Sequence, residues 1–142
     1  ALLQELGFDY NSNGFDDDLP YYHRFDDGRS PLLMLPYALD CNDMKFFHPN
    51  GFVTADEFVR YVQDGVDVLM REGERGRPKL LNIGFHLRIS GRPSRFAAVE
   101  RILEHLSMMG DRVWVATRED IASCFRSQHP PTANGSALGD FP

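Results

Sequence analysis

Cysteine is scarce in this sequence. Among 142 residues only Cys41 and Cys124 carry a thiol, and their wide separation fits neither a metal-binding spacing nor a disulfide framework. We therefore expect two reduced thiols, which is typical of proteins in the cytoplasm.

Long apolar runs and an excess of basic charge are also missing. No run approaches the roughly 20 apolar residues of a membrane span, and we expect no signal peptide ahead of the first motif. The 15 Lys and Arg residues against 21 Asp and Glu give a net charge of -6. Because nucleic acids and anionic membranes attract basic surfaces, we expect a soluble protein that binds neither.

Several motifs that carry chemistry are absent. The sequence has no glycine-rich phosphate loop and no Gly-x-Ser-x-Gly motif, which argues against a serine or cysteine nucleophile. Four of the histidines lack neighbours at metal-binding spacing; they are His23, His48, His105 and His129. We therefore predict no metal site built from this chain alone.

The sequence does contain the pattern of one α/β domain. Its 42% hydrophobic and 12% aromatic residues are enough for a sizeable core. Short apolar runs alternate with amphipathic segments, which is typical of parallel strands joined by right-handed crossovers through outer helices. The predicted strands are Phe8–Tyr10, Tyr21–Phe25, Leu32–Pro36, Lys79–Phe85 and Arg112–Ala116.

Capping residues predict where the two long helices lie. Thr54 and Glu57 have the spacing of a capping box and predict a helix that ends at Gly73. A second helix is predicted from Ser94 onward, after a polar loop over Leu87–Pro93. The residues that it is predicted to bury are Ala98, Val99, Ile102, Leu103 and Leu106.

The two ends of the sequence differ in pattern from its middle. Thr117 predicts the cap of a last helix, Ile121 to about Arg126, and residues 127–142 are expected to form an extended or mobile tail. Residues 1–7 have the pattern of a helix end without its beginning. We therefore expect the domain to start before Ala1.

His86 is the leading candidate for catalysis. It follows the apolar run that ends at Phe85, and the downstream ends of parallel strands are where α/β folds hold their chemistry. The loop after Leu32–Pro36 brings Asp40 and Asp43 to the same edge. A carboxylate beside an imidazole orients the ring and stabilises its charged form, so the pair is a credible general acid.

Less specific interpretations of these residues remain open. His86 can be a strand-end histidine bonded to a backbone carbonyl, and the segment from Asp40 to Asp43 can simply cap turns. Thr117–Asp120 forms a third loop that we expect to converge on the same edge.

Five further residues are candidates for substrate binding. Guanidinium groups match carboxylates and carbonyl-rich ligands, although they also tie loops to nearby oxygens. Tyr37 and Asn42 stand in the loop that carries the aspartates. The complete set is Tyr37, Asn42, Arg88, Arg92 and Arg95.

Three ordered segments resemble the later motifs of the polysaccharide deacetylase superfamily. These segments are Leu35–Met44, Gly84–Pro93 and Asp111–Ala122, and they are most similar to the branch of cofactor-independent, deacetylase-like allantoinases of purine catabolism. The resemblance implies a distorted (β/α) barrel in which His86 is the general acid and Asp43 or Asp40 orients it. Met44 stands where sugar-deacetylating members have an aromatic residue, which favours the allantoinase-like branch.

The early motifs of that superfamily are missing, including the aspartate pair, the paired histidines and the arginine motif. A complete (β/α) barrel typically needs about 250 residues, so residues 1–126 are interpreted as the C-terminal half of the catalytic domain. Catalysis is then expected to need the N-terminal half, in cis or in trans, and a divalent metal such as zinc would be held by residues outside this chain. Exposed edges of a half-barrel predict a homo-oligomer.

The resemblance predicts a hydrolase that acts on carbon–nitrogen bonds, opening allantoin, a cyclic ureide, to allantoate. A metal-dependent carbohydrate N-deacetylase is the first alternative, because it shares the attack of water and the acid. A non-catalytic half that binds a partner chain is the second.

Overall fold

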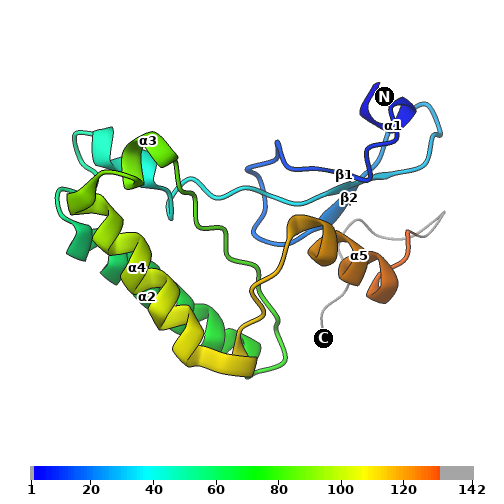
Figure 1. The fold of residues 1–142 in the computed structure, drawn as a ribbon. Helices are drawn as coiled ribbons and strands as arrows, with labels where there is room; N and C mark the ends of the chain where they lie inside the picture. The colour runs from blue at the N-terminus through cyan, green and yellow to red at the C-terminus, as the bar shows by residue number, and fades with distance from the viewer. Residues whose placement is uncertain (1, 132–142) are drawn as a thin grey trace. The chain divides into compact units, whose positions relative to one another are not determined.

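The computed structural model describes residues 2–131, which divide into two compact units. Unit 1 contains the residues up to Tyr37 together with those from Ala116 onward, and unit 2 is the continuous segment Ala38–Val115. Figure 1 shows both units along the chain. Within residues 2–131, no helix combines the length and the apolar character that a membrane crossing requires.

The sheet of unit 1 is small and mixed. It contains β1 (Tyr10–Asn11), β2 (Tyr21–His23) and β3 (Leu32–Met34) in the order β1-β3-β2. The central strand, β3, is buried along its whole length. It is parallel to β1 and antiparallel to β2, so the prediction of an all-parallel sheet is wrong here. A short connection joins β2 to β3, and a parallel pair would need a much longer crossover.

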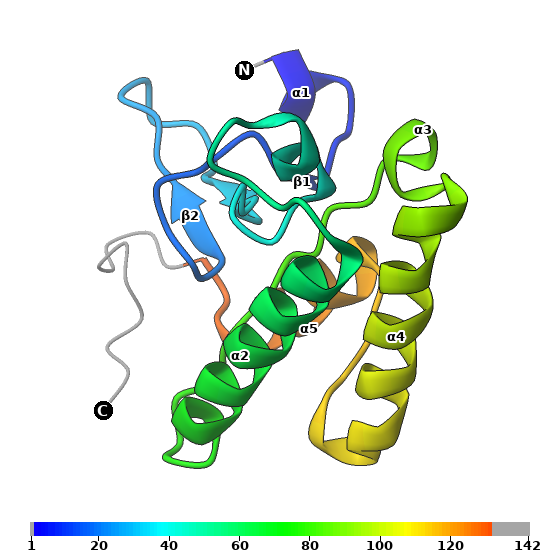
Figure 2. The same cartoon turned by 90° about the vertical axis from the view of Figure 1, so that its left-hand side faces the viewer.

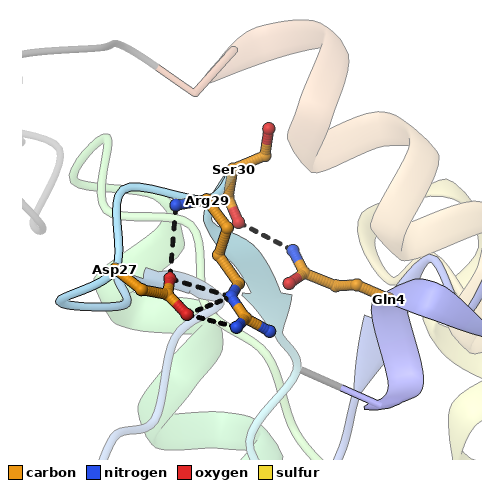
Figure 3. Close-up of polar contacts among 4 residues, drawn as sticks. All are labelled: Gln4, Asp27, Arg29 and Ser30. Carbon is orange, nitrogen blue, oxygen red and sulfur yellow. Dashed lines mark hydrogen bonds and ion pairs between the residues drawn. The ribbon is translucent and has the colours of Figure 1, made fainter.

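The turn between β2 and β3 holds the N-terminal helix, α1 (Leu2–Glu5). Figure 3 shows the Asp27 carboxylate around the Arg29 guanidinium, and the amide nitrogen of Gln4 donating to the carbonyl of Ser30 at 2.7 Å. Gly28 takes a positive φ of 75°, a backbone conformation that glycine adopts at no steric cost. Gly28 thus allows the tight turn, and the bond from Gln4 to Ser30 ties α1 to it.

Unit 1 is completed by α5 (Arg118–Gln128). The hydroxyl of Thr117 accepts a hydrogen bond from the backbone N–H of Asp120 at 3.1 Å, as the predicted cap requires. Ala122 is buried against Leu33 and Leu35 of the sheet segment. The helix continues two residues beyond Arg126, into the segment expected to be a tail, and most of that tail lies outside the described residues.

Two long helices form the body of unit 2. The helices α2 (Ala55–Gly73) and α4 (Pro93–Met109) lie side by side in both views (Figures 1 and 2). The predicted capping box is present at the start of α2, which ends at Gly73 as predicted. The core between them contains Phe58, Val62, Ala98 and Ile102, each fully buried.

The other elements of unit 2 are single turns. They are the 3-10 helix η1 (Asp43–Phe47), the helix α3 (Leu87–Ser90) and the 3-10 helix η2 (Gly110–Arg112). The sequence predicted a polar loop where α3 lies. On α4, Leu103 is 53% exposed and Val99 and Leu106 are half-buried, so full burial was predicted correctly only for Ala98 and Ile102.

Two predicted strands are not strands in the structure. Residues 79–85 are extended but pair with a neighbour only at the isolated parallel bridge between Asn42 and Gly84. Residues 113–117 follow η2 without regular pairing. A strand requires a ladder of bonds to an adjacent strand, and the described residues supply none along most of these two segments. The described part of the chain is therefore a mixed helix and sheet structure.

Candidate active site

Backbone pairing brings the two halves of the candidate site together. The N–H of Gly84 donates to the carbonyl of Cys41 at 2.9 Å, and the N–H of Asp43 donates to the carbonyl of Gly84 at 3.0 Å. This bridge places Asp43, at the start of η1, beside the segment that leads into His86.

The Asp43 carboxylate is fully buried and accepts three hydrogen bonds. Its Oδ1 lies 2.6 Å from Nδ1 of His86. Its Oδ2 accepts from the backbone N–H of His86 at 2.6 Å and from the hydroxyl of Ser90 at 2.5 Å. A buried carboxylate is costly unless its oxygens are bonded, and here both oxygens have donors.

The same contacts orient the His86 ring. A carboxylate oxygen can only accept, so Nδ1 is the nitrogen that carries a hydrogen toward Asp43. Among residues 2–131, Nε2 makes no hydrogen bond, and the side chain is 37% exposed. The ring therefore has one nitrogen held inside the protein and one available to a reacting group.

The single turn α3 positions the two donors to Oδ2 of Asp43, which are the backbone N–H of His86 and the hydroxyl of Ser90. The N–H groups of Ile89 and Ser90 donate to the carbonyl of His86 at 2.8 and 2.9 Å, which starts the helix at His86. Gly91 follows, and a Cβ there would lie 2.2 Å from the carbonyl oxygen of Leu87. Glycine is therefore required for the chain to close this turn.

Ser90 is the site residue that the sequence did not reveal. It is 3% exposed and lies four residues after His86, a spacing that places two side chains on the same face of a helix. This signal was lost because Leu87–Pro93 was predicted to be a polar loop.

The structure separates the two candidate aspartates. Asp43 contacts His86, whereas the Asp40 carboxylate is exposed and lies 3.4 Å from the Tyr61 hydroxyl and 3.9 Å from Sγ of Cys41. Within the described residues Asp40 makes no contact with His86. Among the described residues, Asp43 is the carboxylate bonded to His86, and a catalytic role for Asp40 stays a prediction.

Asn42 has the capping role that was left open. Its side chain is 2% exposed and its Oδ1 accepts from the N–H of Met44 at 2.9 Å, at the start of η1. An Asx side chain that bonds the backbone two residues onward is a common device of turns. The Asn42 amide oxygen therefore helps to position the backbone around Asp43, and substrate binding by Asn42 stays a prediction.

The three arginines occupy different environments. The guanidinium of Arg95 lies over the rings of Phe46 and Phe47, at 4.9 and 5.0 Å from their centroids. Cation–π stacking of this kind holds a side chain in place, so Arg95 ties α4 to η1. Arg88 and Arg92 are exposed, and their binding of substrate stays a prediction.

Tyr37 belongs to unit 1, unlike the other candidates. Its ring meets Phe15 edge to face at 6.0 Å, and the Arg118 guanidinium lies 5.8 Å from its centroid. Arg118 also donates to the carbonyl of Leu35 at 3.1 Å and to the Ser12 hydroxyl at 2.8 Å. The predicted convergence of three loops involves both units and stays a prediction.

The chemistry of other groups near the site is limited by burial and charge. Cys41 is 1% exposed, and burial together with the adjacent Asp40 carboxylate raises the pKa of its thiol to about 12. Such a thiol is inert near neutral pH. Residues 2–131 contain no group of three or more His, Cys, Asp or Glu side chains that could hold a metal ion.

The chain is similar to known proteins in sequence and in fold. No family model matches the chain. It is 40% identical over 138 residues to a Schizosaccharomyces pombe protein named "Putative polysaccharide deacetylase". The solved structure of Puue allantoinase superposes with a TM-score of 0.84 at 42% identity, over 92% of this chain. A structure titled "probable Polysaccharide deacetylase", from Pseudomonas aeruginosa PAO1, gives a TM-score of 0.84 at 44% identity, again over 92%.

These similar proteins point to the polysaccharide deacetylase family. The match to the S. pombe protein includes 91% of this chain but only 43% of the S. pombe protein. The chain likewise spans 43% of each of the two solved chains. The two solved chains share a mixed α and β fold with the chain described here, and the matched proteins are named as deacetylases or an allantoinase, which are hydrolases.

Proposed function

We propose that this chain supplies the general acid of an allantoinase-like amidohydrolase that opens allantoin to allantoate. The observation that carries the proposal is the fully buried Asp43 carboxylate, which holds Nδ1 of His86 at 2.6 Å while the ring remains 37% exposed. The likeness to Puue allantoinase supports the choice of a cyclic ureide as substrate.

The reaction requires a proton at the point where this histidine offers one. The oxygen of water bonds to a ring amide carbonyl carbon, and the ring carbon–nitrogen bond breaks with its electron pair passing to nitrogen. An amide nitrogen is a poor leaving group as an anion, so a proton must reach it. In the protonated ring, Nε2–H of His86 donates that proton, and Nδ1–H stays bonded to Asp43.

The remaining parts of the machinery are assigned to residues outside this chain. The base that takes the proton from water, and any divalent metal such as zinc, would come from the rest of the catalytic domain, in cis or in trans. We further propose that the whole enzyme works in the cytoplasm and associates as a homo-oligomer. Arg88 and Arg92, both exposed at the ends of α3, would hold ureide oxygens.

The test is allantoin hydrolysis by the protein expressed from its complete reading frame. Replacing His86 with Ala is expected to lower kcat by about 10²- to 10⁴-fold, the usual contribution of a general acid. His48→Ala is the matched control, because the His48 side chain is exposed and its Nδ1 accepts a bond from the N–H of Asn50, away from His86 in the chain. Unchanged turnover in His86→Ala would remove the assigned acid and favour a non-catalytic, partner-binding role.

A metal-dependent carbohydrate N-deacetylase is the second candidate. The names of the S. pombe and P. aeruginosa proteins favour it, and it would use the same Asp43–His86 pair. The two candidates are separated by assaying allantoin and N-acetylglucosamine oligomers side by side, before and after dialysis against a chelator. Deacetylation that is lost on dialysis and restored by zinc would select the deacetylase.

A further inference from the structure

We propose that Ser90 is a positioning residue that acts on the general acid through Asp43. The inference rests on the proposed function of His86, and it deepens that function by adding a residue that never touches the substrate. Its hydroxyl donates to Oδ2 of Asp43 at 2.5 Å, and neither residue is more than 3% exposed.

The two oxygens of the Asp43 carboxylate have different hydrogen-bond donors. Oδ2 accepts from the backbone N–H of His86 and from the Ser90 hydroxyl, whereas Oδ1 accepts from the ring nitrogen Nδ1 alone among the described residues. A carboxyl group can rotate about its bond to Cβ, because this type of torsion has broad minima. Two donors on Oδ2, arriving from separate atoms, restrict that rotation and keep Oδ1 aimed at the ring.

The position of Ser90 in α3 makes this bond unusual for a helical serine. A serine inside a helix commonly bonds the carbonyl four residues earlier, which here is that of His86. The His86 carbonyl is instead used by backbone N–H groups, and the Ser90 hydroxyl crosses to a residue 47 positions earlier in the chain. Asp43 is therefore bonded to both ends of the five-residue segment from His86 to Ser90.

Ser90 has no other polar task among the described residues. Its hydroxyl makes one side-chain bond, to Asp43, and the next residue, Gly91, closes the turn without using it. Alanine would fill the same space except for the hydroxyl oxygen. A Ser90→Ala variant accordingly removes one donor from Oδ2 and leaves α3 and the backbone bond from His86 in place.

The first readout is kinetic, on the protein from the complete reading frame. Ser90→Ala is expected to lower kcat by about 10-fold with KM within about twofold, as loss of one charge-assisted bond to the orienting carboxylate would do. Ser94→Ala, an exposed serine in the first turn of α4, should leave kcat unchanged. Added to His86→Ala, Ser90→Ala should cause no further loss, because residues that act as a unit are non-additive.

The second readout does not depend on any substrate. In protein labelled with 15N-histidine, the Nδ1–H proton of His86 should give a resolved downfield resonance that disappears in Asp43→Asn. In Ser90→Ala this resonance should broaden or shift through faster exchange, and in Ser94→Ala it should stay in place. If the substrate assignment were wrong but the resonance behaved as expected, the positioning role would stand and the proposed function alone would fail.

Either of two results would overturn the proposal. One is a Ser90→Ala protein with unchanged resonance and unchanged kcat, whatever its unfolding temperature, which would make the serine merely structural. The other is a full 10-fold loss when Ser90→Ala is added to His86→Ala, since the serine would then act independently of the histidine.

Discussion

At the scale of single residues, burial decides which carboxylate and which thiol can take part in chemistry. Asp43 is fully buried and has three donors, while Asp40 is exposed beside Tyr61. Cys41 lies between them in the chain, with its sulfur enclosed in the core of unit 2. Its burial leaves His86 and Asp43 as the candidate catalytic pair of this region.

The thiol of Cys41 is expected to resist alkylation in the native protein. Burial, reinforced by the negative charge of Asp40, raises its pKa to about 12, so at pH 8 only about one thiol in ten thousand is ionised. Cys124 is half-buried and serves as the internal control. Iodoacetamide treatment followed by peptide mass spectrometry should modify Cys124 first, and both residues equally in denaturant. Equal modification of the native protein would contradict the burial of Cys41.

At the scale of elements, the start of α2 shows how a few polar atoms fix a helix. The Glu57 carboxylate accepts from the backbone N–H groups of Thr54 and Val53 at 2.9 and 2.6 Å, and the Thr54 hydroxyl accepts from the N–H of Glu57 at 3.3 Å. These bonds satisfy N–H groups that lack partners at a helix start. The bonds from Thr54 and Val53 hold the pKa of Glu57 below its ordinary value.

This shift gives the stability of α2 a defined pH dependence. A carboxyl whose pKa is lower in the folded state stabilises the protein fully at pH values above its unfolded pKa of about 4. This stabilisation is lost as the pH falls through the pKa of the folded state. Glu57→Gln should therefore unfold at a lower temperature than wild type at pH 7, and the difference in unfolding temperature should be smaller at pH 3. Glu104→Gln, at an exposed position on α4, is the control. A gap of constant size at both pH values would contradict the ionised cap.

At the scale of the whole molecule, each unit has its own core. In unit 2 the ring of Phe58 lies 5.0 Å from Phe52, 5.7 Å from Phe46 and 6.0 Å from Phe85, measured between ring centroids. Phe85 directly precedes His86. The aromatic core of unit 2 therefore extends to the residue next to the candidate acid.

Removing the centre of this core should destabilise the protein strongly. Phe58 is 0% exposed, and Phe58→Ala is expected to lower the free energy of unfolding by about 3–5 kcal/mol, through lost burial and the cavity left behind. Val68→Ala, on the same helix with Val68 44% exposed, should change it by less than about 0.5 kcal/mol. Urea denaturation monitored by circular dichroism measures both. A similar loss in the two variants would contradict the core assignment.

Local signals predicted the helices well and the strands poorly. The Thr54–Glu57 box, the Thr117 cap and the end at Gly73 were all found where the sequence indicated, because such signals act within a few residues. A strand depends on a partner elsewhere in the chain, and residues 79–85 have one bridge only. Apolar content alone does not provide that partner.

The candidate site was predicted in part for the same reason. The sequence identified His86 and a pair of aspartates, but the choice of Asp43 depends on the bridge to Gly84 and on the burial of η1. Ser90 was missed because its role appears only once α3 is known to be helical. The caps at Asn42 and the stacking of Arg95 likewise need three-dimensional neighbours.

The division of the chain sets an order in which its parts are completed on the ribosome. Unit 2 is the uninterrupted segment Ala38–Val115 and contains Asp43, His86 and Ser90. The core of unit 1 needs Ala122, which is synthesised later than all of them. Compact units can fold as the chain emerges from the ribosome. The bonds around Asp43 can therefore form before α5, the helix that completes the core of unit 1, has been synthesised.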